Sequence, residues 1–316
     1  MYLVFYLLLL YNNLEVKGMI YTVTLSPALD YVMKLDNLII GKINRSKNEQ
    51  YIPGGKGINV SIVLKNLGIN STTLGFLGGF IGEYIEAKLN ELGIINDFVH
   101  INDNTRINVK INSDIETSIN GYGPNINKEN INQLINKIKN INDGDYLVLS
   151  GSIPKNINSN IYLDIIKSIQ NKNINIIVDT TNKALINTLE YHPFLIKPNL
   201  EELEDIFNTK ITSYNDLIIY AKKLNEMGAE NVIVSMDKGA LILGNNIKPT
   251  FIKTINGNVI NTVGAGDSLI AGFLYKYLNT NDLIDSLRYG VSAGSATSFS
   301  EGLAIKGDID KIYNLL

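Results

Sequence analysis

The stretch Thr262-Val-Gly-Ala-Gly-Asp-Ser268 is a glycine turn that leads into a helix. Gly264 and Gly266 permit backbone angles that other residues avoid. The apolar residues in 270–277 have i, i+3, i+4, i+7 spacing, which predicts an amphipathic helix behind the turn. The first N–H groups of a helix lack carbonyl partners, so the stretch predicts an anion site with Asp267 beside it as a proton acceptor. Alternatively, Asp267 is only the helix N-cap.

Outward from this turn, short runs rich in Val and Ile alternate with helical patterns. We expect the runs to be strands buried on both faces of a sheet. They are Ile20–Leu25, Tyr146–Ser150, Ile174–Asp179, Phe194–Ile196 and Asn231–Ser235. Alternating strands and helices predict an α/β fold with a doubly wound, mostly parallel sheet flanked by helices.

Two stretches, at about 30–53 and 105–121, interrupt this alternation. Residues 105–111 alternate between polar and apolar, which is typical of a strand with one wet face. We expect both stretches to form a small antiparallel sheet that acts as a lid. Its apolar outer positions predict a homodimer through this sheet. No boundary divides the rest, so residues 19–316 are predicted to be one domain.

Composition excludes several kinds of partner and site. The net charge is −3 and no basic stretch is present, so we expect no nucleic-acid partner. The absence of Cys rules out disulfides and thiolate metal sites and is consistent with a cytoplasmic protein. The apolar start is shorter than the roughly 20 residues that span a bilayer, so we expect no membrane partner. Since Met19 opens the first predicted strand, residues 1–18 are predicted to be a non-native or dispensable extension.

A second glycine turn, Pro53-Gly-Gly-Lys-Gly-Ile-Asn59, also enters a helix. No Ser or Thr follows Lys56, so it is not a P-loop. Gly54 and Gly55 allow a ligand to approach the backbone, and Lys56 and Asn59 offer hydrogen-bond donors to hydroxyl groups. A purely structural turn is the alternative.

The stretch Lys197-Pro-Asn-Leu-Glu-Glu202 follows another predicted strand. Asn199 and Glu202 share one face of the next helix, and oxygen ligands at this spacing suit Mg²⁺ held largely through water. The alternative is a capping box between the same two residues, and both can hold together.

Arg106, Asn108 and Lys110 alternate along a predicted strand and so face the same side. Two cations on one face can hold a substrate phosphate, with Arg forming a bidentate contact. Ordinary solvated charge is the alternative.

These motifs occur together and in order, and in this the chain resembles the ribokinase-like (phosphofructokinase B) carbohydrate kinases from about Met19 to its end. The matching branch contains 1-phosphofructokinase, tagatose-6-phosphate kinase and the minor 6-phosphofructokinase. Further matching pieces are Thr24–Asp30, Gly75–Gly79, Ser150–Pro154 and Gly290–Phe299. Thr105–Lys110 and Ile119–Pro124 are most similar to 1-phosphofructokinase.

The resemblance implies a ribokinase-like fold and an enzyme that uses ATP and Mg²⁺. The implied reaction phosphorylates D-fructose 1-phosphate at its 6-hydroxyl to give fructose 1,6-bisphosphate. Tagatose-6-phosphate kinase remains an alternative, as does a non-catalytic sugar-phosphate-binding regulator.

The resemblance also implies residue roles. Asp267 is the base, and the amides of Gly264, Ala265 and Gly266 form the anion hole for the γ-phosphoryl group. The residues implied to bind sugar hydroxyls are Asp30, Gly54, Gly55, Lys56 and Asn59. Those implied to bind the substrate phosphate are Lys42, Arg45, Arg106 and Ser152. Those implied for the nucleotide are Lys197, Asn199, Ser235, Gly239, Gly264 and Gly266, with Asn199 and Glu202 for Mg²⁺.

Two departures from the family pattern stand out. Ser26 occupies a position where the family usually has Asn. The loop Ser235-Met-Asp-Lys-Gly239 is one residue shorter than the usual Ser-x-Gly-x-x-Gly and lacks its first glycine.

Overall fold

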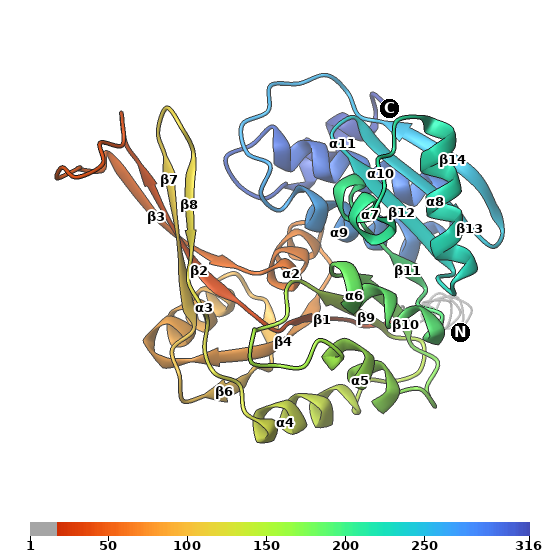
Figure 1. Cartoon of the computed structure of the whole chain (residues 1–316), viewed down its shortest axis with the longest axis horizontal. Helices are drawn as coiled ribbons and strands as arrows, with labels where there is room; N and C mark the ends of the chain where they lie inside the picture. Colours follow the sequence, from red (N-terminus) through yellow and green to blue (C-terminus); the bar gives the residue numbers. More distant parts are fainter. Residues whose placement is uncertain (1–17) are drawn as a thin grey trace, which may run out of the picture.

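The computed structural model describes residues 18–316, which form a large sheet with helices on both faces (Figure 1). The predicted extension over residues 1–18 therefore lies, except for Gly18, outside the described residues. The strand order is β14-β13-β12-β11-β10-β9-β1-β4-β5, and β6 pairs with β4. The pairs β12–β13 and β13–β14 are antiparallel and the others are parallel. The predicted doubly wound, mostly parallel fold is confirmed.

The strands of the large sheet are β1 (Ile20–Thr24), β4 (Ser71–Gly78), β5 (Ile95–Asn96), β6 (Val99–Ile101), β9 (Tyr146–Ser150), β10 (Asn175–Asp179), β11 (Leu195–Ile196), β12 (Asn231–Met236), β13 (Gly239–Gly244) and β14 (Ile247–Lys253). The helices are α2 (Lys56–Asn66), α3 (Gly79–Glu91), α4 (Lys128–Ile138), α5 (Ile161–Ser168), α6 (Asn182–Ile186), α7 (Leu200–Phe207), α8 (Tyr214–Glu226), α9 (Ala265–Thr280), α10 (Leu283–Ser298) and α11 (Lys306–Tyr313), with a short 3₁₀ turn at Leu189–Tyr191.

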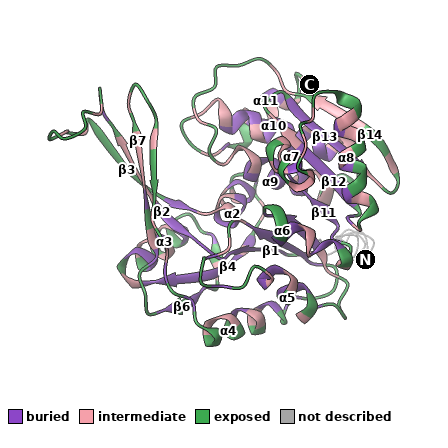
Figure 2. Ribbon diagram, in the orientation of Figure 1, coloured by how far each residue is buried: buried purple, intermediate pink, exposed green. Residues whose placement is uncertain are grey.

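The core lies on both faces of this sheet because successive strand residues point to opposite sides. In β9, Leu147 packs in the cluster with α4, α5 and α8, and Val148 packs in the cluster with α2, α9 and α10. Figure 2 shows the central strands as mostly buried. Burial on both faces explains why these strands are continuous apolar runs.

A smaller sheet, which we call the lid sheet, stands away from the main body at the left of Figure 1. Its strands, in the order β3-β2-β7-β8, are β2 (Ala28–Lys34), β3 (Asn48–Gly54), β7 (Arg106–Asn112) and β8 (Thr117–Asn120). The outer pairs β2–β3 and β7–β8 are antiparallel, as predicted, while the central pair β2–β7 is parallel. Polar–apolar alternation predicts a strand with one wet face, but it does not encode the direction of the neighbouring strand.

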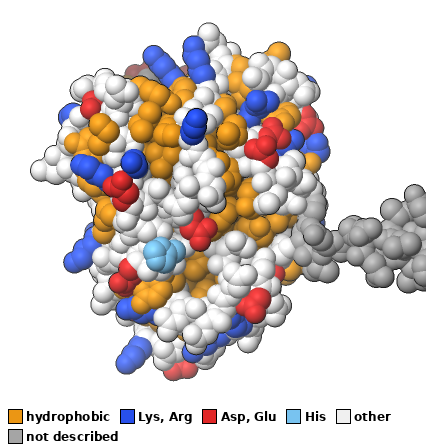
Figure 3. All heavy atoms as spheres, turned by 90° about the vertical axis from the view of Figure 1, so that its right-hand side faces the viewer, with side chains coloured by type: hydrophobic (Ala, Val, Ile, Leu, Met, Phe, Trp, Pro, Cys, Tyr) orange, Lys and Arg blue, Asp and Glu red, His pale blue; other side chains and the backbone are white. Residues whose placement is uncertain are grey.

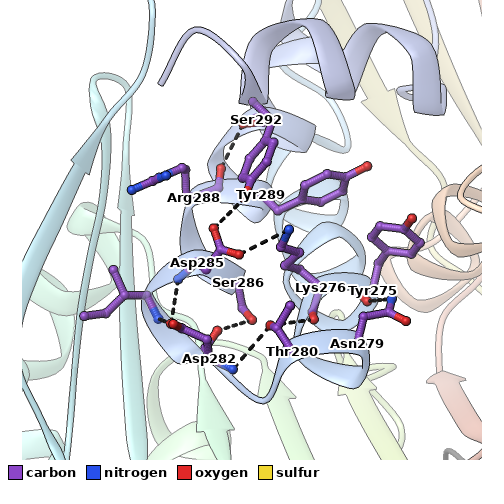
Figure 4. A network of polar contacts seen from close by, with 12 residues as sticks. Tyr275, Lys276, Asn279, Thr280, Asp282, Asp285, Ser286, Arg288, Tyr289 and Ser292 are labelled. Carbon is purple, nitrogen blue, oxygen red and sulfur yellow. Dashed lines mark hydrogen bonds and ion pairs between the residues drawn. The ribbon is translucent and has the colours of Figure 1, made fainter.

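The far end of α9 is fixed by a polar network with α10 and α11 (Figure 4). Lys276 Nζ lies 3.1 Å from Asp285 Oδ2, and the hydroxyl of Tyr313 donates to Asp285 Oδ1 at 2.6 Å. Asp282 caps α10 by accepting from the amides of Ile284 and Asp285. The network anchors α9 at the end opposite to Asp267.

The face of the molecule in Figure 3 carries basic and acidic side chains interspersed with apolar ones. Within residues 18–316, no helix is both long and apolar enough to cross a membrane.

Candidate active site

The start of α9 forms the turn that the glycines predict. Gly264 is the N-cap residue with φ 80°, a left-handed conformation that favours glycine. A Cβ on Gly264 would also lie 2.5 Å from Leu303 Cδ2, so a side chain has no room there. The amide of Ala265 donates to the Thr262 carbonyl at 3.3 Å, whereas those of Gly264 and Gly266 have no partner among the described residues. Two of the three amides expected to bind an anion are therefore free.

Asp267 lies in the first turn of α9 and is only 5% exposed. Asn59 Nδ2 donates to Asp267 Oδ2 at 2.8 Å, which leaves Oδ1 for a ligand. Burial, together with the nearby carboxylate of Asp179, raises the pKa of Asp267 to about 6, although Asn59 and two lysines oppose the rise. The alternative that Asp267 is only the helix N-cap is therefore wrong, because Gly264 holds that position and no side chain caps the start of α9.

Asp179, at the end of β10, is fully buried and was not singled out from the sequence. Its Oδ1 lies 3.2 Å from Lys197 Nζ and 3.3 Å from Lys56 Nζ. Burial alone would raise the pKa of Asp179, but the two ammonium groups outweigh it and hold the pKa below its ordinary value. The available sequence signal was its place at the carboxyl end of a buried parallel strand, where open α/β sheets bind ligands.

Lys197, 4% exposed, brings its charge to the start of α9. A Cβ on Gly266 would lie 3.2 Å from Lys197 Nζ, so the ammonium group lies directly against the glycine backbone. The free amides of the turn and the positive end of the helix dipole are in the same place. These features together form a site suited to the terminal phosphates of a nucleotide.

Asn199 and Glu202 form the capping box at the start of α7. Asn199 Oδ1 accepts from the Glu202 amide at 2.7 Å, and Glu202 Oε2 accepts from the Asn199 amide at 2.8 Å. This leaves Glu202 Oε1 free for a further ligand. Ser235 lies beside Asn199, because its amide donates to the Pro198 carbonyl at 3.1 Å.

Gly239 has a packing reason to be glycine. It opens β13 after a two-residue turn, and a Cβ there would lie 2.1 Å from the Ile252 carbonyl oxygen. The shortened Ser235–Gly239 loop thus forms a tight hairpin between β12 and β13.

On the lid side, Asp30 and Arg106 lie at one end of the lid sheet. Asn108 Nδ2 donates to Asp30 Oδ1 at 2.7 Å, and a Cβ on Gly54 would lie 2.9 Å from Asp30 Oδ2. Arg106 Nη2 donates to the Ser26 carbonyl at 3.1 Å, while its buried Nε has no partner among the described residues. Burial lowers the pKa of Arg106, and the Asp30 carboxylate opposes the shift. An unpaired donor on a half-buried guanidinium is suited to an anionic ligand.

Lys42 and Arg45 do not join Arg106 within one chain. Both are exposed in the loop 35–47 between β2 and β3. Ala28, the partner of Arg106, is at one end of β2, and this loop follows Lys34 at the other end, about 20 Å along the strand. The expected cluster of three cations is therefore not formed in the single chain. Ser152 is exposed in the loop after β9.

The turn 53–59 connects the two halves of the site. It leaves β3 beside Asp30 and enters α2, where Asn59 contacts Asp267. Gly55 has φ 130°, and a Cβ there would lie 2.6 Å from Thr24 Cγ2. Lys56, which is expected to donate to sugar hydroxyls, also contacts Asp179 through its ammonium group at 3.3 Å. This one turn therefore connects Asp30 in the lid sheet with Asn59, which contacts Asp267.

Comparisons with known proteins agree with this geometry. Residues 24–309 match the model of the pfkB family of carbohydrate kinases. The chain is 45% identical to a 1-phosphofructokinase from Borreliella burgdorferi, over 93% of this chain and 96% of that protein. It is 40% identical to a D-tagatose-1-phosphate kinase from Bacillus licheniformis, over 93% and 96% respectively.

Among solved structures, phosphofructokinase-2 from Escherichia coli in complex with fructose-6-phosphate superposes with a TM-score of 0.89. It is 29% identical, and the match covers 95% of this chain and 99% of that one. A glycine turn with a buried aspartate, a match over nearly the whole chain and a shared fold lead to the same conclusion. The chain belongs to the pfkB family of carbohydrate kinases.

Proposed function

We propose that the chain is an ATP-dependent 1-phosphofructokinase, which transfers the γ-phosphoryl group of ATP to the 6-hydroxyl of D-fructose 1-phosphate. The observation that carries the proposal is that the turn 53–59 leads from the end of the lid sheet that bears Asp30 and Arg106 to Asn59, which contacts the buried Asp267. A sugar with a phosphate at one end and a hydroxyl at the other fits this arrangement. The similarity to 1-phosphofructokinases supports the choice of substrate.

In this proposal Asp267 Oδ1 accepts the proton of the 6-hydroxyl as the new P–O bond forms and the bond to ADP breaks. Asn59 holds the other carboxylate oxygen and so orients the group. The free amides of Gly264 and Gly266 and the ammonium group of Lys197 compensate the charge of the transferring phosphoryl group. Product release then lets Asp267 return its proton to water. Positioning and charge compensation supply most of what phosphoryl transfer requires.

The nucleotide side also fits Mg²⁺. Glu202 Oε1 is free of the capping box, and no group of three or more His, Asp or Glu gathers as a metal cage among residues 18–316. Mg²⁺ in kinases is bound by few carboxylates, by water and by substrate phosphates, so one free carboxylate oxygen is a suitable contribution. When bound, the ion neutralises phosphate charge. Glu202 would hold it, and Asn199, whose Oδ1 caps α7, would hold Glu202 in place.

D-Tagatose 1-phosphate is the second candidate substrate, because a relative at 40% identity is named for it. This sugar differs from fructose 1-phosphate only in the configuration at C4, and both carry the acceptor hydroxyl at C6. Two alternatives from the sequence are also tested below: phosphorylation of tagatose 6-phosphate, and a sugar-phosphate-binding regulator without catalytic activity. The cytoplasmic location also stays a prediction.

The proposed function is tested by a coupled assay of ADP release with purified protein. The substrates are fructose 1-phosphate, tagatose 1-phosphate, tagatose 6-phosphate, fructose 6-phosphate and free fructose. The highest kcat/KM is expected with fructose 1-phosphate. A higher value with another sugar would reassign the substrate, and no turnover with any of them would favour the regulator.

We expect kcat/KM to fall as the pH is lowered through about 6, because the raised pKa of Asp267 leaves it protonated below that value and unable to accept a proton. The phosphates of both substrates also titrate near pH 6, so a control is needed. Lys56 lowers the pKa of Asp267. In Lys56→Met the fall of kcat/KM at low pH should therefore begin at a higher pH. If the fall occurs at the same pH in this variant as in the wild type, it is caused by titration of the substrate phosphates and not of Asp267.

We also propose that the chain forms a homodimer through the lid sheet, whose exposed apolar side chains include Tyr51, Ile107 and Ile119. Lys42 and Arg45 can reach a substrate phosphate only if the loop 35–47 of one chain extends to the site of a second chain. Light scattering is expected to give twice the chain mass. A monomer at assay concentrations would rule out both the dimer and a role for these two residues.

A further inference from the structure

The residues beside Arg106 form a glycine-flanked turn around it. The Gly121 carbonyl accepts from Arg106 Nη1 at 3.5 Å, and a Cβ on Gly121 would lie 3.1 Å from Arg106 Cβ. A Cβ on Gly123, which has φ +89°, would lie 3.6 Å from Arg106 Cδ. Tyr122 stands between these two glycines, and it is 76% exposed. A large aromatic side chain is thus placed at the rim of the Arg106 site without being part of the core.

Lys155 lies over this ring, with Nζ 5.0 Å from the ring centroid of Tyr122. The two residues belong to different loops, and the next residue along the chain ties these loops together. Asn156 Nδ2 donates to Asn125 Oδ1 at 2.6 Å and to the Ile126 carbonyl at 2.8 Å. Because these bonds fix the two loops to each other, they place the backbone of Lys155 beside the loop of Tyr122, and the exposed Lys155 side chain lies over the Tyr122 ring.

The loop that carries Lys155 begins at the catalytic end of the site. The amide of Gly151 donates to the Asp179 carbonyl at 3.0 Å, and a Cβ on Gly151 would lie 3.8 Å from Lys56 Cβ. Residues 151–155 therefore extend from the Asp179 cluster to Tyr122 beside Arg106. Ser152, which the family resemblance assigns to the substrate phosphate, lies on this path.

Within a single chain, where Lys42 and Arg45 lie away from Arg106, the charge balance at this end of the site leaves a place for a further cation. A phosphate monoester carries a charge of about −1.5 to −2, whereas the single charge of Arg106 already interacts with the Asp30 carboxylate. Within residues 18–316, Lys155 has no carboxylate partner. We propose that Lys155, held by Tyr122, binds the phosphate of the sugar substrate together with Arg106. This inference rests on the proposed function, since it assigns a residue to the phosphate end of that substrate.

The test is steady-state kinetics with fructose 1-phosphate on Lys155→Met. The KM for fructose 1-phosphate should rise about 3- to 10-fold, while kcat and the KM for ATP change less than about twofold. Lys155→Arg should restore the KM because it keeps the charge. Lys167→Met is the matched control, since Lys167 also lies over a tyrosine ring, 5.8 Å from that of Tyr191, but on α5. Arg106→Ala, which removes the half-buried cation, should give a larger rise in the same KM.

Tyr122 is a positioning residue in this proposal, so Tyr122→Phe should keep the KM and Tyr122→Ala should raise it, by less than Lys155→Met does. An unchanged KM in Lys155→Met, or an equal loss in kcat, would overturn the assignment. If the wild type turns over fructose 1-phosphate and Lys155→Met behaves identically, only this inference fails. If the wild type shows no turnover, calorimetric titration with fructose 1-phosphate decides: weaker binding by Lys155→Met supports the role of Lys155 even though the proposed function fails, and equal binding refutes it.

Discussion

Replacing Asp267 with Asn is expected to lower kcat by about 10²–10⁴ and to change the KM for both substrates only modestly. An amide cannot take the proton of the acceptor hydroxyl, but it keeps the shape of the carboxylate and leaves the free amides of Gly264 and Gly266 in place. The measurement is steady-state ADP release with fructose 1-phosphate at pH 7.5. A kcat equal to that of the wild type would remove Asp267 from the mechanism.

Asp282→Asn is a suitable control, because Asp282 also lies at a helix N-terminus but only caps α10. Asn is as good an N-cap as Asp, so no change in kcat is expected.

The stability of Asp267→Asn gives a second, independent test of the raised pKa of Asp267. Since the folded pKa of Asp267 is raised to about 6, the folded protein binds a proton more tightly than the unfolded chain between about pH 4 and 6.

The ionised carboxylate of Asp267 therefore costs stability above about pH 6, and this cost disappears as the pH falls. Asp267→Asn should accordingly unfold at a higher temperature than the wild type at pH 7.5. The difference should shrink below pH 6. A variant that lost both activity and stability at pH 7.5 would indicate misfolding and not the loss of a base.

The second large effect is expected for Asp179→Ala, which should destabilise the fold by about 3–5 kcal/mol. The substitution leaves the ammonium group of Lys197, 4% exposed, without its carboxylate. For a chain of this length the melting temperature should fall by about 5–8 °C, measured by thermal unfolding at pH 7.5. Nucleotide should restore part of the loss, because its phosphates supply a new anion beside Lys197.

The exposed pair of Lys47 and Asp36 provides the matched control. Asp36→Ala should change stability by less than about 1 kcal/mol, because water solvates Lys47 after the loss of its partner. The double variant Asp179→Ala, Lys197→Met removes both buried charges and should recover much of the stability lost in Asp179→Ala. Equal melting temperatures for Asp179→Ala and the wild type would show that the buried carboxylate does not stabilise Lys197.

The parts of the site that sequence predicted well depend on neighbours along the chain. The turn before α9 requires glycine at Gly264, where φ is 80°. The capping box of α7 links Asn199 and Glu202, three positions apart, and it appears in the structure with both hydrogen bonds. The resemblance to a family, not the spacing, indicates which of these motifs are expected to bind a nucleotide and which a sugar.

The parts that sequence reasoning missed depend on residues far apart in the chain. Lys56 and Asp179 are separated by 123 positions, and only the order of strands brings them together. The family resemblance groups Lys42 and Arg45 with Arg106, whereas the direction of β2 carries them away from it. No local pattern encodes either fact.

By itself, the sequence determined the strand and helix pattern, the glycine turn that bears Asp267 and the presence of a separate small sheet, because periodicity, backbone freedom and helix capping are local properties. Only the tertiary structure decided the parallel pairing of β2 with β7, the buried cluster of Asp179 with two lysines, and the position of Lys155 over Tyr122. Strand pairing and the burial of charge join segments distant in sequence, and their energies depend on distances and solvent exclusion that exist only once the chain has folded.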